Sequence, residues 1–331
     1  MPLCDTRQCC ARHPRACSSR SSSSQTTSSN YVREDTAAAA RILRALASTD
    51  GDLAVTHTTG ANLPFARNWW RHLQRAGVQN FALLATDDDA EDALARELPT
   101  RHVRCPRAIL SPQSAASASR GPVSYRSAGW TRLMFAVPQM VRWVLKLGVN
   151  VLWLDTDVVT LANPFPTIRS QLPLAGSSAS ALVLASVDGR VPAEDPRECG
   201  VAYSADARWG RSASGWKLCG GLFYVQQGSA ALAFLRDWER RLRAPASGAK
   251  NQPHYNEALR AHQLTLPVRV LPCDLFPNGY RYASAAWRRA QTRSPLMVHG
   301  NWLKGSAAKL ERFREWGMWL SDDNQTRSLA E

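Results

Sequence analysis

The chain has 331 residues, of which 44% are hydrophobic, and its formal net charge is +14. This length can hold one large α/β domain or two small ones, and the twelve tryptophans contribute to a sizeable core. The chain has no run of about 18 apolar residues, which excludes an ordinary membrane-spanning helix. Its arginines are scattered without the aromatic-basic motif of a nucleic-acid-binding protein, so we expect no nucleic acid partner.

Low-complexity sequence occupies residues 1–50, where a run of serines and threonines is followed by a run of alanines. We predict that this segment is disordered apart from a short helix near Ala37–Ala47. Its arginine- and serine-rich start has the composition of a transit peptide but lacks the apolar core of a signal peptide, so no targeting segment is evident. Residues 51–320 are expected to form one folded domain, and residues 321–331 a polar tail.

Strands and helices are expected to alternate through the first half of the chain. Pro64 opens a helix whose apolar residues share one face and which Gly77 ends. A long polar loop at Arg107–Gly129 precedes a helical pattern that runs from Trp130 to Gly148 and that Pro138 should kink. The strands predicted in this half are Leu53–Thr56, Phe81–Ala85, a short strand at Val103 and Val151–Leu154.

Two aspartates directly follow the last of these strands. Because alternate residues of an extended chain point to the same side, Asp155 and Asp157 can converge on one point. Carboxylates that close repel each other unless a cation or a proton lies between them. A hard divalent ion that prefers oxygen ligands, Mg²⁺ or Mn²⁺, is therefore the predicted occupant.

The alternative for this pair is an acidic turn or the start of a helix. A second acidic run, Asp87–Asp89, also follows an apolar strand, and the residues after it are typical of a capped first helical turn. After Asp157 the chain continues Val-Val-Thr-Leu and then has two prolines, a sequence that predicts no helix start. This difference favours a metal site at Asp155 and Asp157 and a helix cap at the other run.

The second half continues the same alternation. Ser229 and Ser306 are expected to cap helices, and a third helix should span Asn251–His262. Cys219-Gly220-Gly221 is expected to form the turn that enters a strand. The predicted strands are Ala181–Val187, Leu222–Val225, Val268–Leu271 and Leu296–Val298, and polar loops are predicted at Asp188–Ser214 and Cys273–Tyr280. This pattern predicts an α/β fold with a mainly parallel, doubly wound sheet and flanking helices.

His299 comes at the end of the last predicted strand. Sheets of this kind bind ligands beyond the carboxyl ends of their strands, and Asp155, Asp157 and His299 each directly follow an apolar strand. We therefore expect these three side chains to share one metal site. The alternative for His299 is an ordinary histidine of the core.

Other candidates have weaker signals. Thr56, His57 and Thr58 lie at the end of the first strand, where a base or ribose would sit, although a loop there would be polar in any case. Gly220 and Gly221 can let a ligand approach the backbone, or can simply form a turn.

The helical candidates also have ordinary alternatives. Gln252 and Asn256 share one helix face, which capping explains almost as well, and Trp302 is interpreted as packing rather than sugar stacking. Lys309 belongs to a basic group that indicates a phosphate-rich ligand, or simply a solvated surface. The group consists of Arg281, Arg288, Arg289, Arg293, Lys304, Lys309, Arg312 and Arg314.

Together these motifs resemble the nucleotide-diphospho-sugar transferase domain of glycosyltransferase family seventy-seven, which includes plant xylosyl- and arabinosyltransferases of the Golgi. The resemblance covers roughly residues 53–320. Its anchors are Val55-Thr56, Asn68-Trp69-Trp70, Leu152-Trp153-Leu154-Asp155-Thr156-Asp157, Asn163-Pro164-Phe165, Gly220-Gly221-Leu222-Phe223-Tyr224-Val225, Gln252 with Asn256, Phe276-Pro277-Asn278-Gly279, and His299-Gly300-Asn301-Trp302-Leu303-Lys304-Gly305 with Lys309 and Arg312.

The resemblance implies a GT-A fold and metal-dependent transfer of a sugar, a pentose or galactose, from a UDP-sugar to a glycan or glycoprotein, with retention. It assigns catalytic roles to Asp155, Asp157, Gln252 and Lys309, and the Mn²⁺ or Mg²⁺ to Asp155, Asp157 and His299. The donor would be bound by Thr56, His57, Thr58, Asp155, Gly220, Gly221, Gly305 and Lys309. It also implies a location in the Golgi lumen or at the Golgi membrane.

The chain departs from the family pattern at one position, and two alternative functions stay open. The family has Asp-Gln where this chain has Asn251-Gln252, which makes a non-catalytic sugar-nucleotide or glycan-binding relative an alternative. Haloacid-dehalogenase phosphatases also place Asp-x-Asp after an apolar strand, but their second acidic pair would have to be Asp322-Asp323 in the polar tail.

The cysteines form no C-x-x-C pair, so a zinc site is not expected, and disulfides and buried thiols are equal alternatives.

Overall fold

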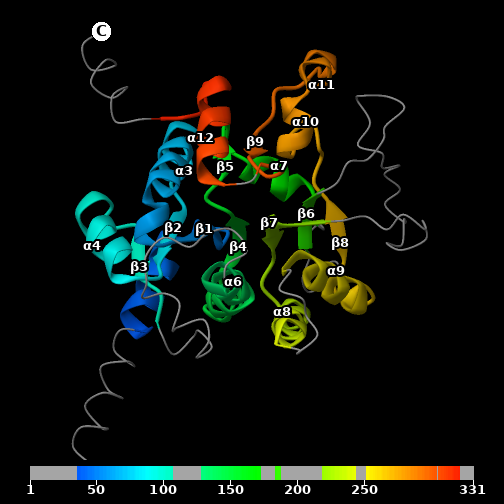
Figure 1. Ribbon diagram of the computed structural model, residues 1–331. Coiled ribbons are helices and arrows are strands. Elements are labelled where there is room, and N and C mark those ends of the chain that lie inside the picture. Colours follow the sequence, from blue (N-terminus) through cyan, green and yellow to red (C-terminus); the bar gives the residue numbers. More distant parts are fainter. Residues whose placement is uncertain are drawn as a thin grey trace, which may run out of the picture.

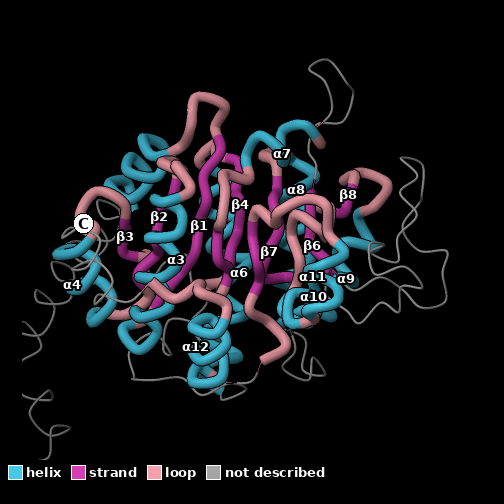
Figure 2. The backbone as a smooth tube through the Cα atoms, turned by 90° about the horizontal axis from the view of Figure 1, so that it is seen from above, coloured by secondary structure: helices cyan, strands magenta, loops and turns pink. Residues whose placement is uncertain are grey.

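A seven-stranded sheet organises the computed structural model, which describes residues 36–106, 128–172, 183–187, 218–243, 251–303 and 305–320. Across the sheet the strands follow the order β3-β2-β1-β4-β7-β6-β8, which Figure 2 shows from above. Their bounds are β1 Asp52–Thr58, β2 Phe81–Ala85, β3 His102–Arg104, β4 Asn150–Leu154, β6 Val183–Val187, β7 Leu218–Val225 and β8 Val268–Val270.

The four strands from β3 to β4 run parallel to one another, and β8 runs parallel to β6. Strand β7 is the exception, because it pairs antiparallel with both β4 and β6. The predicted α/β fold with a mainly parallel sheet and flanking helices is therefore confirmed. The antiparallel β7 has a consequence for the site, because it brings its amino-terminal half beside the carboxyl end of β4.

Helices cover both faces of the sheet (Figure 1). One face carries α6 (Ala128–Lys146), α8 (Ser229–Leu242) and α9 (Asn251–His262), and the other carries α3 (Leu63–Arg75). The helix α4 (Asp88–Glu97) packs beside β2 and β3. Alternate strand residues divide between the two faces, as the period of two in an extended chain requires.

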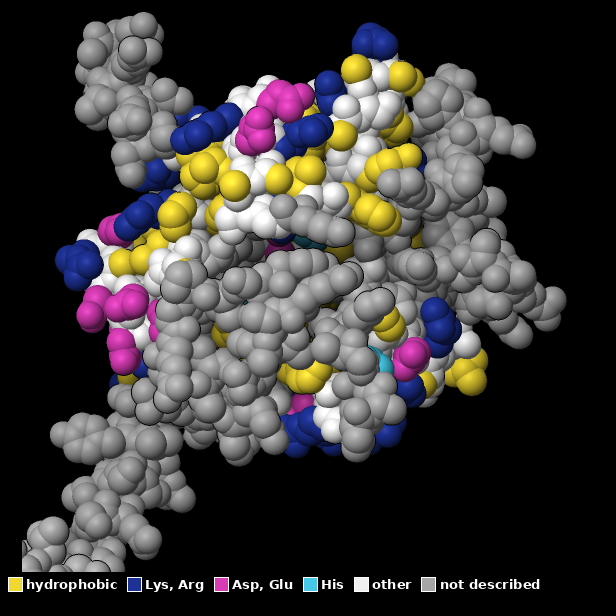
Figure 3. Space-filling model, in the orientation of Figure 1, with side chains coloured by type: hydrophobic (Ala, Val, Ile, Leu, Met, Phe, Trp, Pro, Cys, Tyr) yellow, Lys and Arg dark blue, Asp and Glu magenta, His cyan; other side chains and the backbone are white. Residues whose placement is uncertain are grey.

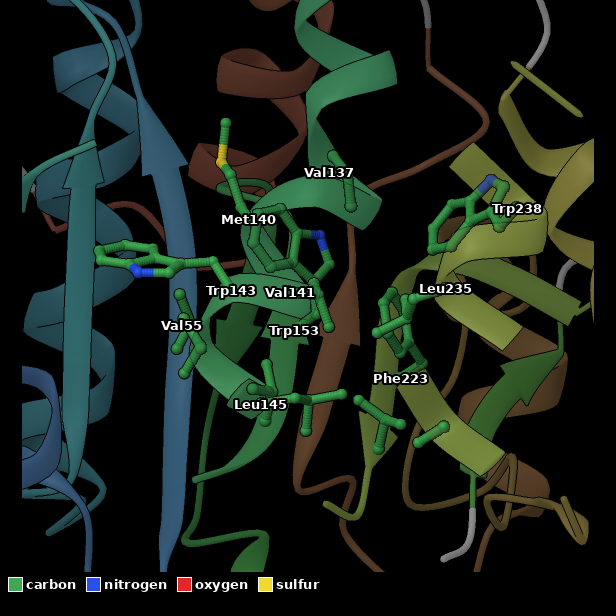
Figure 4. Packing of buried hydrophobic residues seen from close by; sticks show 14 of the residues in the cluster. Val55, Val137, Met140, Val141, Trp143, Leu145, Trp153, Phe223, Leu235 and Trp238 are labelled. Carbon is green, nitrogen blue, oxygen red and sulfur yellow. The ribbon is translucent and has the colours of Figure 1, made fainter. Parts of the chain in front are cut away.

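The larger core lies between the sheet and α6 and α8 (Figure 4). Trp153 of β4 and Phe223 of β7 belong to it, and the ring of Trp238 of α8 packs edge-on against Phe223, with ring centroids 6.0 Å apart. Trp153 has no exposed surface, so its truncation to alanine should cost about 3–5 kcal/mol. This packing fixes β4, and with it the position at which the two aspartates leave the sheet.

A second, two-stranded sheet lies beyond the carboxyl end of β4. It consists of β5 (Val158–Thr160) and β9 (Met297–His299), which pair antiparallel. Val159 and Val298 of this sheet pack against Phe65 of α3 and Phe313 of α12, in a small core of their own. The helices α7 (Phe165–Ser170), α10 (Gly279–Ala283), α11 (Ala285–Ala290) and α12 (Ser306–Glu315) complete this part.

Several predicted elements are confirmed and several need correction. The bounds of β2 and α9 match the prediction. Gly220 and Gly221 lie within β7 instead of in a turn, because the strand starts earlier, at Leu218. The two prolines after Asp157 were interpreted as predicting no helix start, and this was wrong, because α7 begins between them at Phe165. Prolines are tolerated at the start of a helix, where no backbone N–H is needed for an intrahelical bond.

The expected serine caps were also wrong. The residues at the cap positions of α8 and α12 are Gly228 and Gly305, neither of which makes a side-chain cap bond, and Ser229 and Ser306 are the first helical residues. Gly305 has φ +84°, a left-handed conformation that glycine adopts without the usual strain.

The folded part begins before the predicted boundary at residue 51. Residues 36–46 are helical, as expected for a short helix, and Leu43 is fully buried in the larger core. Residues 1–35 of the predicted tail, residues 107–127 of the first predicted loop, the predicted loop at 188–214 and residues 321–331 lie outside the described residues. The last two residues of the loop predicted at Arg107–Gly129 are helical instead, because α6 begins at Ala128. Among the described helices, none combines the length and the apolar character that crossing a membrane requires.

Candidate functional site

The turn between β4 and β5 carries both aspartates. Val158 donates its backbone N–H to the carbonyl of Asp155 at 3.0 Å, and Asp155 donates its own to the carbonyl of Gly221 on β7 at 2.7 Å. The pair was predicted to converge because of strand geometry. The two carboxylates do converge, but a tight turn brings them together and not an extended segment.

His299 completes the cluster from the neighbouring small sheet. Ligand atoms of Asp155, Asp157 and His299 all lie within 4.8 Å of one another, and His299 Nε2 is 3.3 Å from Asp157 Oδ1. His299 is opposite Val158 in the antiparallel pairing of β9 with β5. The expected meeting of these three side chains is thus observed, but His299 ends a strand of the second sheet and not of the main one.

Gly221 gives the cluster its space. A Cβ atom added at Gly221 would lie 2.3 Å from Asp155 Oδ2 and 2.8 Å from His299 Cε1, which is closer than real contacts allow. A Cβ added at Gly220 would meet only Tyr255 and Trp238 of the core, at 3.8–4.0 Å. Because neighbouring strand residues point to opposite faces, only one of the two glycines borders the cluster.

Lys309 brings a positive charge to the aspartates from α12. Its Nζ lies 2.6 Å from Asp157 Oδ2. Burial opposes the ionisation of Asp157, but the charges and hydrogen bonds of Lys309 and His299 outweigh burial and hold the pKa of this carboxyl well below its usual range. Burial, together with the nearby charge of Asp157, raises the pKa of Asp155 to about 6. Asp157 is therefore the firmly ionised member of the pair.

The second ring nitrogen of His299 contacts a thiol that the sequence analysis did not single out. Cys219 Sγ lies 3.3 Å from His299 Nδ1, and Asn301 directs its Nδ2 to the same sulfur at 3.9 Å. Burial opposes protonation of His299, but interactions with Cys219 and Asp157 raise its pKa above the ordinary value. Cys219 and Cys105 are free and buried, and Cys273 is disulfide-bonded, so both alternatives for the cysteines occur.

The three candidates on β1 differ in what they can offer a ligand. Thr56 is fully buried, and its Oγ1 has no hydrogen-bond partner among the described residues. His57 stacks on Trp153 with ring centroids 5.8 Å apart, and burial lowers the pKa of His57 to about 4. Thr58 is engaged in the fold, because its carbonyl accepts hydrogen bonds from both Oγ1 and N of Thr86.

The helix α9 binds to the start of β7. Asn256 accepts from the backbone N–H of Leu218 and donates to its carbonyl, both at 2.8 Å, and also donates to the carbonyl of Gln252. Asn251 uses both ends of its amide, accepting from Trp238 Nε1 at 2.8 Å and donating to the carbonyl of Met134 at 3.2 Å. Asn256 and Asn251 thus support the fold, and the assignment of Gln252 stays a prediction.

The basic group from Arg281 to Arg314 does not gather at the aspartates as a whole. Arg293 pairs with Asp274, Arg312 pairs with Glu315, and Arg288 bonds to the carbonyl of Tyr282. Lys304 lies outside the described residues. Among the described members, Lys309 contacts the cluster, through Asp157.

The donor set fits a hard divalent ion. Two carboxylates and an imidazole converge, and the glycine at position 221 leaves their inner side open. In Figure 3, magenta carboxylate and cyan histidine atoms are visible in a hollow of this face, below the region of α12 and α10. Asp155, Asp157 and His299 are therefore the residues that would hold a metal ion.

Comparison with known proteins gives one family. The model of the nucleotide-diphospho-sugar transferase family matches residues 76–313. A UDP-D-xylose:L-fucose alpha-1,3-D-xylosyltransferase of Arabidopsis thaliana is 27% identical over 290 residues, which cover 85% of this chain and 72% of the relative. A UDP-galactose:fucoside alpha-3-galactosyltransferase of Dictyostelium discoideum is 23% identical over 223 residues, which cover 62% of this chain and 31% of the relative.

Comparison with solved structures gives partial superpositions at low sequence identity. The apo form of mouse xyloside xylosyltransferase 1 is 14% identical and superposes with a TM-score of 0.43, covering 77% of this chain and 99% of that one.

Proposed function

Since the chain belongs to the nucleotide-diphospho-sugar transferase family and is a glycosyltransferase, we propose a specific reaction for it. In this reaction a pentose or galactose is transferred from a UDP-sugar to a glycan. We further propose that the reaction depends on Mn²⁺ or Mg²⁺ and retains the anomeric configuration. The observation that carries the proposal is the convergence of Asp155, Asp157 and His299, with Lys309 in contact with Asp157.

Each residue of this cluster would have a definite task. A bound metal ion would supply positive charge to the diphosphate of the donor, and Asp155, Asp157 and His299 would hold that ion. Lys309 would exchange its contact with Asp157 for a contact with the diphosphate and stabilise the negative charge that develops on the leaving group. The first turn of α12, which begins after Gly305, would add backbone N–H groups that favour an anion.

The donor nucleoside would lie along the end of β1. The ring of His57, which rests on Trp153, would offer its polar edge to a base or ribose. Thr56 is fully buried and its side chain points to the opposite face of the sheet, so it is retained in this proposal only through the resemblance. Gly220 is retained in this proposal only through the resemblance, because a side chain added there would face the core. Gln252 is proposed as a catalytic residue on the same basis.

The acceptor class follows from the relatives. The names of both relatives described above specify fucose or a fucoside as acceptor and an alpha linkage. Because UDP-xylose and UDP-galactose carry α-linked sugars, an alpha product corresponds to retention. We propose a fucose-containing glycan or glycoprotein as acceptor, and a Golgi location, on this likeness alone.

The rival functions have less support. Membership of the transferase family argues against the phosphatase, whose second acidic pair, Asp322-Asp323, lies outside the described residues. The replacement of the family's Asp by Asn251 was the argument for a non-catalytic relative. The Asn251 side chain forms hydrogen bonds to α8 and α6 and makes no contact with Asp155, Asp157 or His299 in these bonds. We therefore retain the enzymatic proposal.

The test is UDP release from a panel of UDP-xylose, UDP-arabinose and UDP-galactose, with methyl α-L-fucoside as acceptor. We expect one donor to give UDP in the presence of Mn²⁺, and chelation with EDTA to abolish the reaction. NMR of the product should show an alpha linkage. Failure of all three donors to release UDP, or activity that survives EDTA, would contradict the proposal, and release of inorganic phosphate from simple esters would support the phosphatase instead.

A further inference from the structure

Two aromatic side chains are conspicuously exposed near the acidic cluster. Trp302 is 47% exposed and Tyr280 is 45% exposed, and their ring centroids lie 6.0 Å apart at an angle of 53°. The other large exposed hydrophobic side chains of the described residues are aliphatic, namely Ile42, Leu161 and Leu264. An exposed pair of large rings in contact is therefore a specific feature of this part of the molecule.

The backbone holds this aromatic pair beside the metal ligands. Asn278 and His299 form a parallel β-bridge, so the segments that follow them run side by side into Tyr280 and Trp302. Trp302 is three residues beyond His299, which places their Cα atoms within about 11 Å of each other. Figure 1 shows α10, which carries Tyr280, next to β9.

Close contacts fix the two segments against each other. Gly279 donates its backbone N–H to Asn301 Oδ1 at 2.9 Å, and Gly300 donates to the carbonyl of Asp157 at 2.7 Å. A Cβ atom added at Gly279 would lie 2.3 Å from the carbonyl oxygen of Asn301. These contacts join the segments that carry the aromatic pair to each other and to the backbone of Asp157.

Trp302 also has an unusual backbone. Its φ is +68°, and among the described residues it is the one non-glycine residue with positive φ. This conformation favours glycine and is unfavourable for a bulky residue. Because the residue is nearly half exposed, burial gives only part of the stabilisation that a tryptophan of the core would contribute. Strain of this kind persists mainly where a functional requirement keeps it.

We propose that Trp302 and Tyr280 form the acceptor subsite, in which they stack on the apolar face of a pyranose ring such as fucose. The proposal rests on the proposed transferase function and assigns Trp302 a ligand where the sequence pattern was interpreted as packing. The C–H groups of one pyranose face pack on aromatic rings, while the hydroxyls at the edge remain free to point elsewhere. One of these hydroxyls would point towards the cluster, where the donor sugar is held.

The experiment measures acceptor binding directly. Wild-type protein with Mn²⁺ and UDP is titrated with methyl α-L-fucoside, and affinity is followed by saturation-transfer NMR and by tryptophan fluorescence. The same titration is repeated with Trp302→Gly, Trp302→Phe and Tyr280→Ala. Leu264→Ala is the control, because Leu264 is a large hydrophobic residue that is 92% exposed and does not belong to the aromatic pair or to the cluster.

Trp302→Gly is the decisive variant, because glycine suits φ +68°. We expect it to fold with an unchanged or higher melting temperature and to lose at least about tenfold in affinity for the fucoside. Trp302→Phe should retain most of the affinity, Tyr280→Ala should lose several-fold, and Leu264→Ala should behave as wild type. UDP affinity is measured in the same samples. An unchanged UDP affinity shows that the substitution removed the aromatic pair without damaging the donor site.

The proposal is overturned if the fucoside binds Trp302→Gly and Tyr280→Ala as tightly as wild type, or if it does not bind wild type at all. It is also overturned if Trp302→Gly lowers the melting temperature and UDP affinity together, because the tryptophan would then be part of the fold. These outcomes are independent of UDP release from a donor, so failure of the transferase proposal would be recognised separately.

Discussion

Two acidic runs follow buried strands of the same sheet, and the fold uses them in opposite ways. After β2, Asp87 accepts from the backbone N–H of Ala90 and caps α4, while Asp88 is 76% exposed on its side chain and pairs with Arg104. After β4, Asp155 and Asp157 converge with His299, and Asp157 also contacts Lys309. The same residue type at the same edge of the sheet therefore gives a helix cap in one place and a candidate metal centre in the other.

The difference lies in what the rest of the chain brings to each run. The acids after β2 find partners within a few residues or on the adjacent strand and loop, and these partners are backbone N–H groups and one surface arginine. Asp157 instead meets Lys309, which lies 152 residues further along the chain. Carboxylates form a candidate site when a histidine and a lysine from distant segments enclose them, and they remain a helix cap when their partners are backbone N–H groups and one surface arginine.

Substituting one aspartate in each run should give the largest difference between the two runs. We expect Asp157→Asn to lower metal-dependent UDP release by about 10²–10³-fold, because it removes a metal ligand and the partner of Lys309. The matched control Asp88→Asn should leave the rate unchanged within about twofold. Steady-state kinetics on variants with native circular dichroism provide the measurement, and equal effects of the two substitutions would contradict the distinction.

The glycines of β7 test whether the space around Asp155 matters. Gly221→Ala would place a methyl group 2.3 Å from Asp155 Oδ2, so we expect Mn²⁺ affinity to fall about tenfold or more. Gly220→Ala is the matched control, since its methyl group would make only ordinary contact with Tyr255. Calorimetric titration of both variants with Mn²⁺ decides the point. Retained affinity in Gly221→Ala would show that the cluster is not constrained in this way.

Removing the cap should have a moderate effect on stability. Asp87→Ala loses the bond from Ala90 and the bonds from the backbone N–H of Gly60, so the free energy of unfolding should fall by about 1–2 kcal/mol. Urea denaturation measures this loss. Asp92→Ala, later in the same helix, is the comparison variant and should change stability by less than about 0.5 kcal/mol. A similar loss in both variants would argue against a specific cap.

The smallest expected effect concerns a histidine next to the acidic helix. The hydrogen bond to Glu91 is the main cause that raises the pKa of His102, and the Nε2–Oε1 distance is 3.4 Å. A raised pKa means that the pair stabilises the fold fully below about pH 6.5, and that this stabilisation is lost as pH rises through the folded-state pKa. His102→Gln should therefore cost a few tenths of a kcal/mol more near pH 6 than near pH 9. A pH-independent cost measured by urea denaturation would contradict this assignment.

Much of the framework could be predicted from local sequence. The apolar run Phe81–Ala85 and the helix Asn251–His262 have the predicted bounds, because the signals that begin and end them lie in neighbouring residues of the sequence. The acidic cap at Asp87 was predicted for the same reason, since a cap is a contact between residues three apart. Serine caps at 229 and 306 were predicted wrongly because a glycine precedes each helix and takes the cap position.

The sequence by itself determined that two carboxylates leave a buried strand together and that a histidine ends another apolar segment. Only the tertiary structure decided that β9 pairs with β5 in a second sheet, that α12 directs Lys309 to Asp157, and that Cys219 contacts the ring of His299. These contacts join segments separated by 80 residues or more, and their geometry depends on the antiparallel placement of β7 and on packing around Phe313. Local patterns carry the periodicity of each element but not the pairing between distant elements, and the site is made of such pairings.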